Sequence, residues 1–288
     1  MTNTRSAPKG GAGARGLGRR AGAAGRRAAR NPWLLRLARV GLAAKGLLFL
    51  IIGYLAVRIA TGTGGGEQAD NSGALQVIAQ NTGGAIVLWA AAAGMGGLAV
   101  WQATVAVLGG RFGAQEPHRR AAAGGRAVVY AVLCGTIVHY LLGTGAPQSQ
   151  DAQSETLTAQ LMALPAGRFI VGAVGLGMIG VGLGQGWRGI SRRFEWDLDL
   201  SGASRAARRT VRVLGVVGNV TFCVVMSAAG LFIGQAALTY DTDRAQGLDG
   251  TLRLFAETPA GPPLLFAVAV GVILYGLYCF CESRYVKG

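Results

Sequence analysis

The chain has 288 residues, of which 51% are hydrophobic and only 14% are charged. Soluble domains carry about 25% charged residues, so this composition argues against a soluble fold. The net charge of +15 would suit nucleic acid or anionic lipid, but the basic residues lie beside apolar segments, which favours anionic phospholipids and gives no reason to expect nucleic acid binding.

Residues 1–31 consist mostly of Gly, Ala and Arg and hold almost no large apolar side chain. This composition predicts a disordered basic arm. Its arginines have two interpretations: the arm binds the membrane surface, or it is a solvated tail that helps to orient the first membrane span.

Apolar segments of near-spanning length follow the arm, since about 20 residues cross a bilayer as a helix. They cover residues 41–60, 85–108, 127–143, 169–186, 213–237 and 264–281. One such window could be a buried helix of a soluble protein, but a series of them with thin loops could not. The sequence therefore predicts an all-α membrane protein with six transmembrane helices.

Lys and Arg are distributed unevenly among the connections. Ten of the 28 precede Val40, and others gather between spans two and three, between spans four and five, and after span six. The other three connections hold most of the Asp and Glu. Because basic loops stay inside, we expect the N-terminus, both basic loops and the C-terminus on the cytoplasmic side of a bacterial plasma membrane.

The second span of each unit reveals an internal repeat. The stretches that begin at Gly84, Gly167 and Gly261 align without gaps, each with a second Gly ten residues later and a polar residue or Cys eight residues after that. The residues just before them are alike as well: NTGG, LPAG and TPAG. We expect three parallel helix-loop-helix repeats, related by an axis along the membrane normal. Their expected ranges are 32–112, 113–200 and 201–288.

The outer connections share a second pattern. LQVIAQN, LTAQLMALP and LRLFAETP each place apolar residues at helical spacing. This predicts short interfacial helices in the outer loops. They act either as simple elbows that return the chain to the bilayer or as a substrate lid.

These motifs permit a comparison with a known family. The segment ARVGLAAKGLLFLIIGYLA at 38–56, the GAL…TGG and TL…PAG loops and the segment RRFEWDLDLSG at 192–202 resemble the bacterial family named domain of unknown function 1206. The resemblance covers nearly everything after the arm. It implies a membrane protein with three copies of a two-helix repeat, and it implies no activity.

Ionisable side chains within spans are functional candidates because they are costly there. Lys45 and Arg126 hold equivalent places in repeats one and two, and Gly218 holds that place in repeat three. Both cations lie near the cytoplasmic edge, where long side chains can anchor a helix by reaching the interface. His139, near the outer end of span three, is either a proton-relay residue or an ordinary interfacial histidine.

Gln102, Gln185 and Cys279 form a second set of equivalent positions, one in each repeat. A threefold arrangement would direct them to one level of the bundle. They would then line a polar path or form hydrogen bonds between helices. Farther on, residues 194–200 alternate apolar and acidic side chains, which predicts an extended segment on the cytoplasmic membrane surface.

The sequence offers little for catalysis. No predicted span contains a carboxylate, no nucleophile has a plausible base nearby, and no spacing indicates a metal or cofactor site. We therefore expect a non-catalytic envelope scaffold or a protein that binds a membrane protein partner. The alternative is a small-solute transporter or channel with pseudo-threefold repeats.

Overall fold

The computed structural model describes residues 32–63, 68–108, 117–143, 149–239, 248–257 and 261–285, and no strand occurs among them. The basic arm predicted for residues 1–31 lies outside this part of the chain. Six of the described helices are long and apolar enough to cross a membrane. They are α2 (Pro32–Ala60), α4 (Gly84–Leu108), α5 (Pro117–Leu141), α7 (Gly167–Ile190), α8 (Arg205–Thr239) and α10 (Gly261–Tyr285). The prediction of an all-α membrane protein with six transmembrane helices is confirmed.

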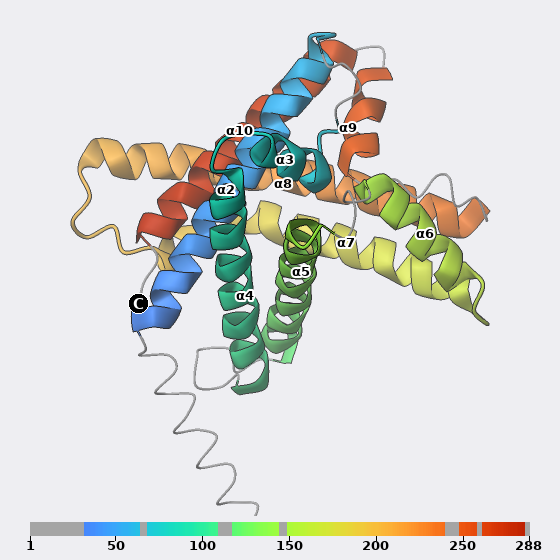
Figure 1. The fold of residues 1–288 in the computed structure, drawn as a ribbon, viewed down its shortest axis with the longest axis horizontal. Helices are drawn as coiled ribbons and strands as arrows, with labels where there is room; N and C mark the ends of the chain where they lie inside the picture. The colour runs from blue at the N-terminus through green and yellow to red at the C-terminus, as the bar shows by residue number, and fades with distance from the viewer. Residues whose placement is uncertain are drawn as a thin grey trace, which may run out of the picture.

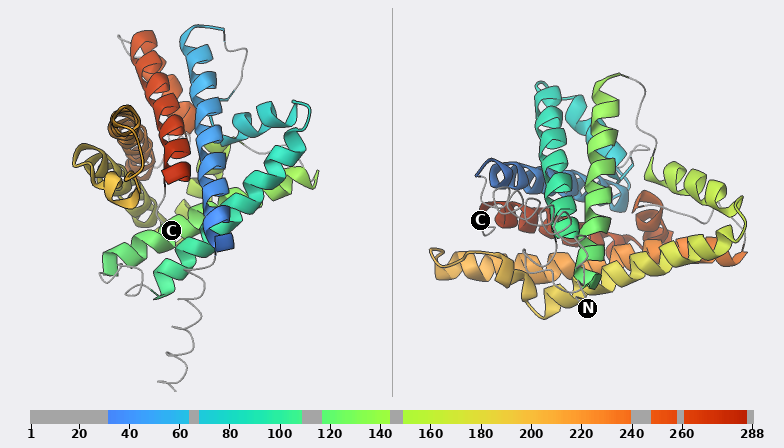
Figure 2. Two further views of the ribbon diagram at one scale, coloured as in Figure 1. Left: turned by 90° about the vertical axis from the view of Figure 1, so that its left-hand side faces the viewer. Right: turned by 90° about the horizontal axis from the view of Figure 1, so that it is seen from below.

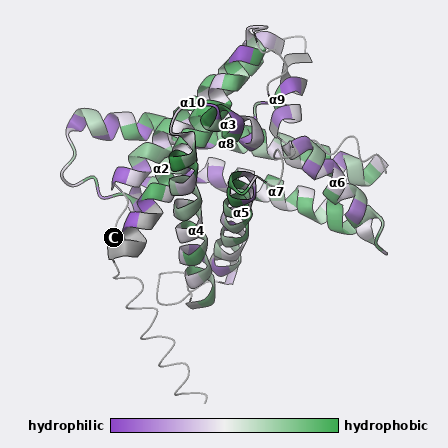
Figure 3. Cartoon of the chain, in the orientation of Figure 1, coloured by the Kyte–Doolittle hydropathy of each residue, from purple (hydrophilic) through white to green (hydrophobic). Residues whose placement is uncertain are grey.

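The long helices extend beyond most of the predicted apolar limits. Helix α5 begins at Pro117, and α10 continues to Tyr285, four residues beyond the predicted end of its span. Hydropathy marks only the part of a helix that matches hydrocarbon, whereas backbone hydrogen bonding continues into the polar interface. Figure 3 shows apolar residues along the long helices and polar residues gathered at the start of α8 and on the short helices.

The short helices of the outer connections are also present. They are α3 (Asn71–Ala79), α6 (Gln150–Met162) and α9 (Leu248–Glu257). Side chains fix where two of them begin, because Asp70 accepts a hydrogen bond from the Gly73 amide and Ser149 accepts one from the Ala152 amide. The predicted short helices are therefore confirmed.

The spans pack as three antiparallel pairs, each made of helices from two different repeats. The most extensive contacts join α7 with α8, α10 with α2, and α4 with α5. The α2–α10 pair lies between the other two pairs, because α2 also contacts α4 and α10 also contacts α8 (Figure 2, left-hand view). Within a repeat, α2 contacts α4 and α8 contacts α10, but α5 and α7 make at most marginal contact among the described residues.

The two ends of the bundle differ in chemistry. The amino ends of α2, α5 and α8 and the carboxyl ends of α4, α7 and α10 lie on one side of the molecule (Figure 1), called here the basic end. The short helices α3, α6 and α9 lie on the other side, called here the outer end. The arrangement matches three helix-loop-helix units that each start and finish at the basic end.

Glycine allows the paired helices to approach until their backbones touch. A Cβ atom added to Gly175 of α7 would lie 2.7 Å from the carbonyl oxygen of Gly230 in α8. A Cβ atom on Gly46 of α2 would lie 2.9 Å from the carbonyl oxygen of Gly276 in α10. In hydrocarbon no hydrophobic force drives helices together, so such close van der Waals contacts stabilise the pairs.

The segment predicted to be extended is mostly a 3-10 helix, η2 (Arg193–Asp197). Phe194 and Leu198 are buried, whereas Trp196 between them is 70% exposed. A strand would put all three on one face, so that prediction was wrong. The buried pair packs in a cluster with Val211, Leu214 and Tyr278, and this tertiary contact overrides the alternating pattern.

Replacing Gly175 with alanine should lower the free energy of unfolding. The new methyl group would press on the backbone of Gly230, which cannot rotate away, and overpacking of this kind costs about 1–3 kcal/mol. Thermal unfolding in a mild detergent measures the effect.

Gly177→Ala is the matched control on the same helix, because an added Cβ there meets no atom within 4 Å. Alanine favours a helix over glycine by about 1 kcal/mol, so this variant should be at least as stable as the parent chain. An equal loss in both variants would contradict the glycine-contact account.

Candidate polar site at the basic end

Ionisable side chains from all three repeats meet near the basic end of the spans. Glu282 of α10 interacts electrostatically with Lys45 of α2, with Arg126 of α5, and with Arg188 of α7. Asp197 of η2 belongs to the same set. These five residues are called here the polar cluster.

The Lys45 side chain of α2 is held in place by contacts with Tyr275 of α10 and with Phe49. Its ammonium group donates a 2.9 Å hydrogen bond to the hydroxyl of Tyr275. The same group lies 5.1 Å from the centre of the Tyr275 ring and 6.0 Å from that of Phe49, so two aromatic faces share its charge. Gly218, which holds the place of Lys45 in repeat three, packs against the backbone of Tyr275.

Glu282 is the main site residue that the sequence reasoning missed. The predicted span ended at residue 281, and no span was expected to contain a carboxylate, but α10 runs to Tyr285 and carries Glu282 in its last turns. Its place could have been inferred from helical spacing, because Tyr275, Tyr278 and Glu282 recur at positions i, i+3 and i+7 on one face. Glu282 lies one residue beyond the predicted end of this span.

Arg188 is already paired. Its guanidinium donates a 2.6 Å hydrogen bond to Asp197, and a longer one of 3.3 Å to the amide oxygen of Gln185. The 3-10 segment η2 thus supplies the counter-charge for an arginine on α7. A second pair joins the same segment to α8, where Arg212 donates to Glu195 at 2.8 Å.

An aromatic layer lies directly beside the polar cluster. The ring of Tyr275 lies 4.9 Å from that of Phe49 and 5.1 Å from that of Phe222, measured between centroids. Tyr278 contacts Phe194 edge-on at 5.3 Å. These rings come from α2, α8, α10 and η2, so large apolar side chains from repeats one, two and three meet beside the cluster.

The predicted set Gln102, Gln185 and Cys279 is only partly brought together. Gln185 reaches the polar cluster through Arg188, and the fully buried Cys279 interacts electrostatically with Lys45 and Glu282. Gln102 is partly exposed on α4, and no hydrogen bond in the described residues links it to the cluster. His139 lies exposed in the last turn of α5, toward the outer end.

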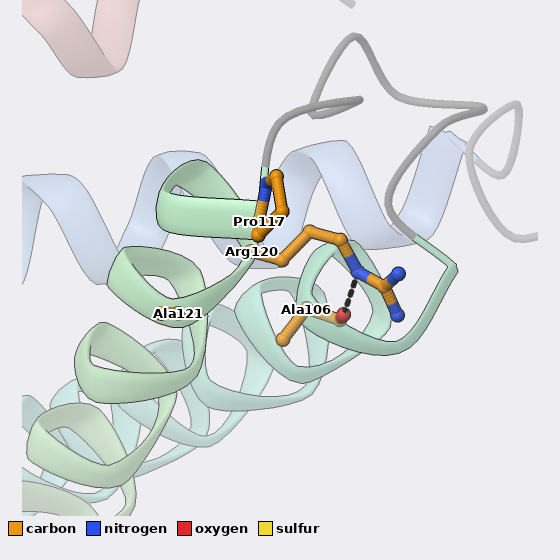
Figure 4. Close-up of a pocket in the computed structure, with 4 residues that line it drawn as sticks. All are labelled: Ala106, Pro117, Arg120 and Ala121. Carbon is orange, nitrogen blue, oxygen red and sulfur yellow. Dashed lines mark hydrogen bonds between the residues drawn. The ribbon is translucent and has the colours of Figure 1, made fainter.

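A surface hollow near the end of α4 does not belong to the cluster. It is lined by Ala106, Pro117, Arg120 and Ala121 (Figure 4). The Arg120 guanidinium donates 2.9 Å hydrogen bonds to the carbonyl oxygens of Ala106 and Val107. It thereby caps the last turn of α4, which explains its position without a ligand.

Two aspartates that the sequence did not single out join the outer connections. Asp249 of α9, 4% exposed, accepts a 2.7 Å hydrogen bond from the Ala69 amide in repeat one. Asp151 of α6 accepts a 2.9 Å hydrogen bond from the Gly250 amide in repeat three. Each carboxylate therefore links the outer connection of its own repeat to that of another repeat.

Chemically, the polar cluster offers cations, carboxylates and a tyrosine hydroxyl, partly screened from water. Such a set can bind a charged group or relay a proton.

Comparisons with known proteins agree with the repeat architecture. A family model described as Domain of Unknown Function (DUF1206) matches the chain over residues 40–109, 121–192 and 217–286. A protein of Bacillus subtilis (strain 168) named Uncharacterized protein YxxB is 29% identical over 258 residues, which cover 88% of this chain and 92% of that protein. No solved structure matches the chain.

Replacing Tyr275 with phenylalanine should destabilise the fold by about 1–3 kcal/mol, because the Lys45 ammonium would lose its hydrogen-bond acceptor within the span. Thermal unfolding in detergent checks the size of the loss.

Tyr278→Phe is the control. Tyr278 is 4% exposed, against 3% for Tyr275, and its hydroxyl has no hydrogen bond in the described part of the chain. This variant should unfold like the parent protein. If the two variants behave alike, the Lys45–Tyr275 bond carries no stability of its own.

Proposed function

Because the chain belongs to the family Domain of Unknown Function (DUF1206), whose description states no activity, we propose a function from the arrangement of its spans alone. The protein is a non-catalytic envelope scaffold that binds a membrane protein partner. The partner docks through a transmembrane helix against the spans of repeat two.

The incomplete packing of repeat two is the observation that carries this proposal. Helices α5 and α7 bury the smallest share of their residues among the six spans. In repeats one and three the two spans of a repeat contact each other, whereas α5 and α7 do so at most marginally among the described residues. Repeat two thus leaves open the faces that its sister repeats cover.

Helix α7 carries glycine on the face that it leaves open. Gly177, Gly180 and Gly184 lie on one side of the helix, and an added Cβ at any of them meets no atom within 4 Å. Gly175 and Gly182, on the opposite side, touch the backbone of α8. A lipid-facing position gains nothing from glycine, which costs about 1 kcal/mol relative to alanine in a helix, whereas a docked helix needs it for close approach.

The transporter alternative has its own support in the polar cluster. Lys45 and Glu282 lie within spans of repeats one and three, and charges in such places often mark ion or substrate paths. The aromatic layer beside the cluster argues for a closed end rather than a continuous path. For these reasons transport is the second candidate.

The membrane and its orientation complete the proposal. The basic end faces the cytoplasm of a bacterial plasma membrane, where its arginines meet anionic phospholipids. Exposed Arg205, Arg208 and Arg209 in the first turns of α8 support this orientation, as does the acidic character of the outer connections.

Topology reporters test the orientation directly. Fusions at residues 65, 148 and 246 should be active outside the cytoplasm, and fusions at residues 115 and 201 should be active within it. A cytoplasmic signal at residue 148 would invert repeat two and remove the basis for the proposed orientation.

The partner site can be tested by site-specific crosslinking in native membranes. A photoreactive residue in place of Ala173, an exposed position on the glycine side of α7, should form a discrete adduct. Gly180→Leu should reduce that adduct about fivefold or more, because an overpacked helix contact costs about 1–3 kcal/mol.

Ala93→Leu, at an exposed position on α4, adds the same bulk to another span and should leave the adduct unchanged. An adduct twice the mass of the chain would identify a second copy as the partner. Solute flux through liposomes that is abolished by Glu282→Gln, together with no adduct at Ala173, would favour the transporter.

A further inference from the structure

The cations of the polar cluster differ in how far the protein neutralises them. Arg188 donates hydrogen bonds to Asp197 and Gln185. Lys45 donates a hydrogen bond to Tyr275 and lies near the rings of Tyr275 and Phe49. Arg126 is exposed, and no hydrogen bond or ion pair is found for its guanidinium among the described residues. One cation of the cluster therefore has all its donors available.

The charges around Arg126 do not balance. Three cations face two carboxylates in the cluster, and Arg188 lies near enough to interact with Arg126 as a like charge. Asp197 is already bonded to Arg188, and Glu282 is shared among three cations. The cluster therefore carries one positive charge in excess, which an additional anion would neutralise.

The depth of Arg126 indicates where that anion comes from. The apolar part of α5 begins at Arg120, so Arg126 lies about 9 Å farther along the helix at 1.5 Å per residue. A long side chain at this depth places its charge at the level of the lipid headgroups. The headgroups of the phospholipids in the adjacent leaflet supply phosphate at this depth.

We propose that Arg126 of α5 binds the phosphate of a membrane phospholipid beside the charged residues of α7 and α10. The guanidinium is a planar fork whose N–H groups match two phosphate oxygens. Glu282 and Arg188 border the same place, so the site lies where repeats two and three meet. The lipid would lie against the basic-end part of α5, and this proposal does not require a protein partner on α7.

A specific lipid site at Arg126 can be distinguished from the general attraction of arginines to an anionic leaflet. General attraction would give every exposed arginine at the basic end a similar share of the binding. A site at Arg126 predicts that one side chain accounts for a retained lipid. Arg209 of α8 supplies the comparison, because it too is exposed and without a hydrogen bond in the described residues, but it lies outside the polar cluster.

Native mass spectrometry of the full chain in mild detergent tests the site. The protein is exposed to phosphatidylglycerol, to phosphatidylethanolamine, and to diacylglycerol with the same acyl chains but no phosphate. The parent chain should retain one phospholipid and no diacylglycerol. Arg126→Gln should weaken retention about tenfold or more, as expected for loss of charge-assisted hydrogen bonds.

Two further variants separate the site from folding and from general charge. Arg126→Lys keeps the charge without the fork and should restore part of the retention. Arg209→Gln should retain lipid like the parent chain, and unfolding midpoints should show that all variants are folded.

Several results would overturn the proposal. These are unchanged retention in Arg126→Gln, an equal loss in Arg209→Gln, or equal retention of diacylglycerol. Displacement of the lipid by glycerol 3-phosphate at the same concentration would reassign the site to a soluble phosphate ester. A partner adduct at Ala173 that persists in Arg126→Gln would leave the proposed function standing while the lipid site is judged separately.

Discussion

Close backbone contact between helices of different repeats is the constraint on which this structure depends. In hydrocarbon, each span satisfies its own backbone hydrogen bonds, and apolar side chains gain little by leaving lipid for one another. Stability must then come from dense contact, which Gly175 and Gly230 supply between α7 and α8, and Gly46 and Gly276 between α2 and α10. Because these pairs join repeats one, two and three, no repeat can complete its packing alone.

The charged residues within the spans follow from the same constraint. A lysine inside a span is tolerated when neighbouring groups accept its charge, and Lys45 obtains them from Tyr275 of α10 and from Phe49 of its own helix. Tyr275 can take its place because Gly218 of repeat three leaves room for its backbone. The three repeats therefore differ at this equivalent position. Lys45 and Arg126 contribute cations to the polar cluster, and Gly218 makes room for Tyr275 beside it.

The sequence predicted what depends on hydropathy and on repetition. Six spans, three repeats and short helices in the outer connections follow from patterns that each chain segment carries by itself. Helix ends were predicted less well, because the predicted spans stop where the apolar run stops, whereas α10 continues past it and includes Glu282. The 3-10 segment was missed for another reason. The alternation at 194–200 is local, whereas burial of Phe194 against Tyr278 is a contact between distant parts of the chain.

The polar positions were predicted in part for a similar reason. Equivalence in a repeat places Gln102, Gln185 and Cys279 at one level only if the repeats are arranged with threefold symmetry. The pairs are stacked instead, with α2 and α10 in the middle, so Cys279 is central, Gln185 reaches the cluster through Arg188, and Gln102 lies apart on α4. Pairing between repeats is decided by the fit of whole helices, which no single segment encodes.

The same connections bear on whether the repeats can move against one another. Alternating access requires one unit to rock relative to the others. Here Asp249 binds the Ala69 amide at the outer end, glycine contacts join the middle, and Lys45 binds Tyr275 toward the basic end, so repeats one and three are held at three levels. Breaking a buried hydrogen bond to a charged group costs about 1.5–3 kcal/mol, and rocking would break several together.

Repeat two is held mainly through contacts with α4 and α8, and its own spans remain apart. The fold therefore leaves a face of repeat two uncovered, but the described part of the chain provides no hinge about which a repeat could rock. That distribution of contacts favours docking over transport.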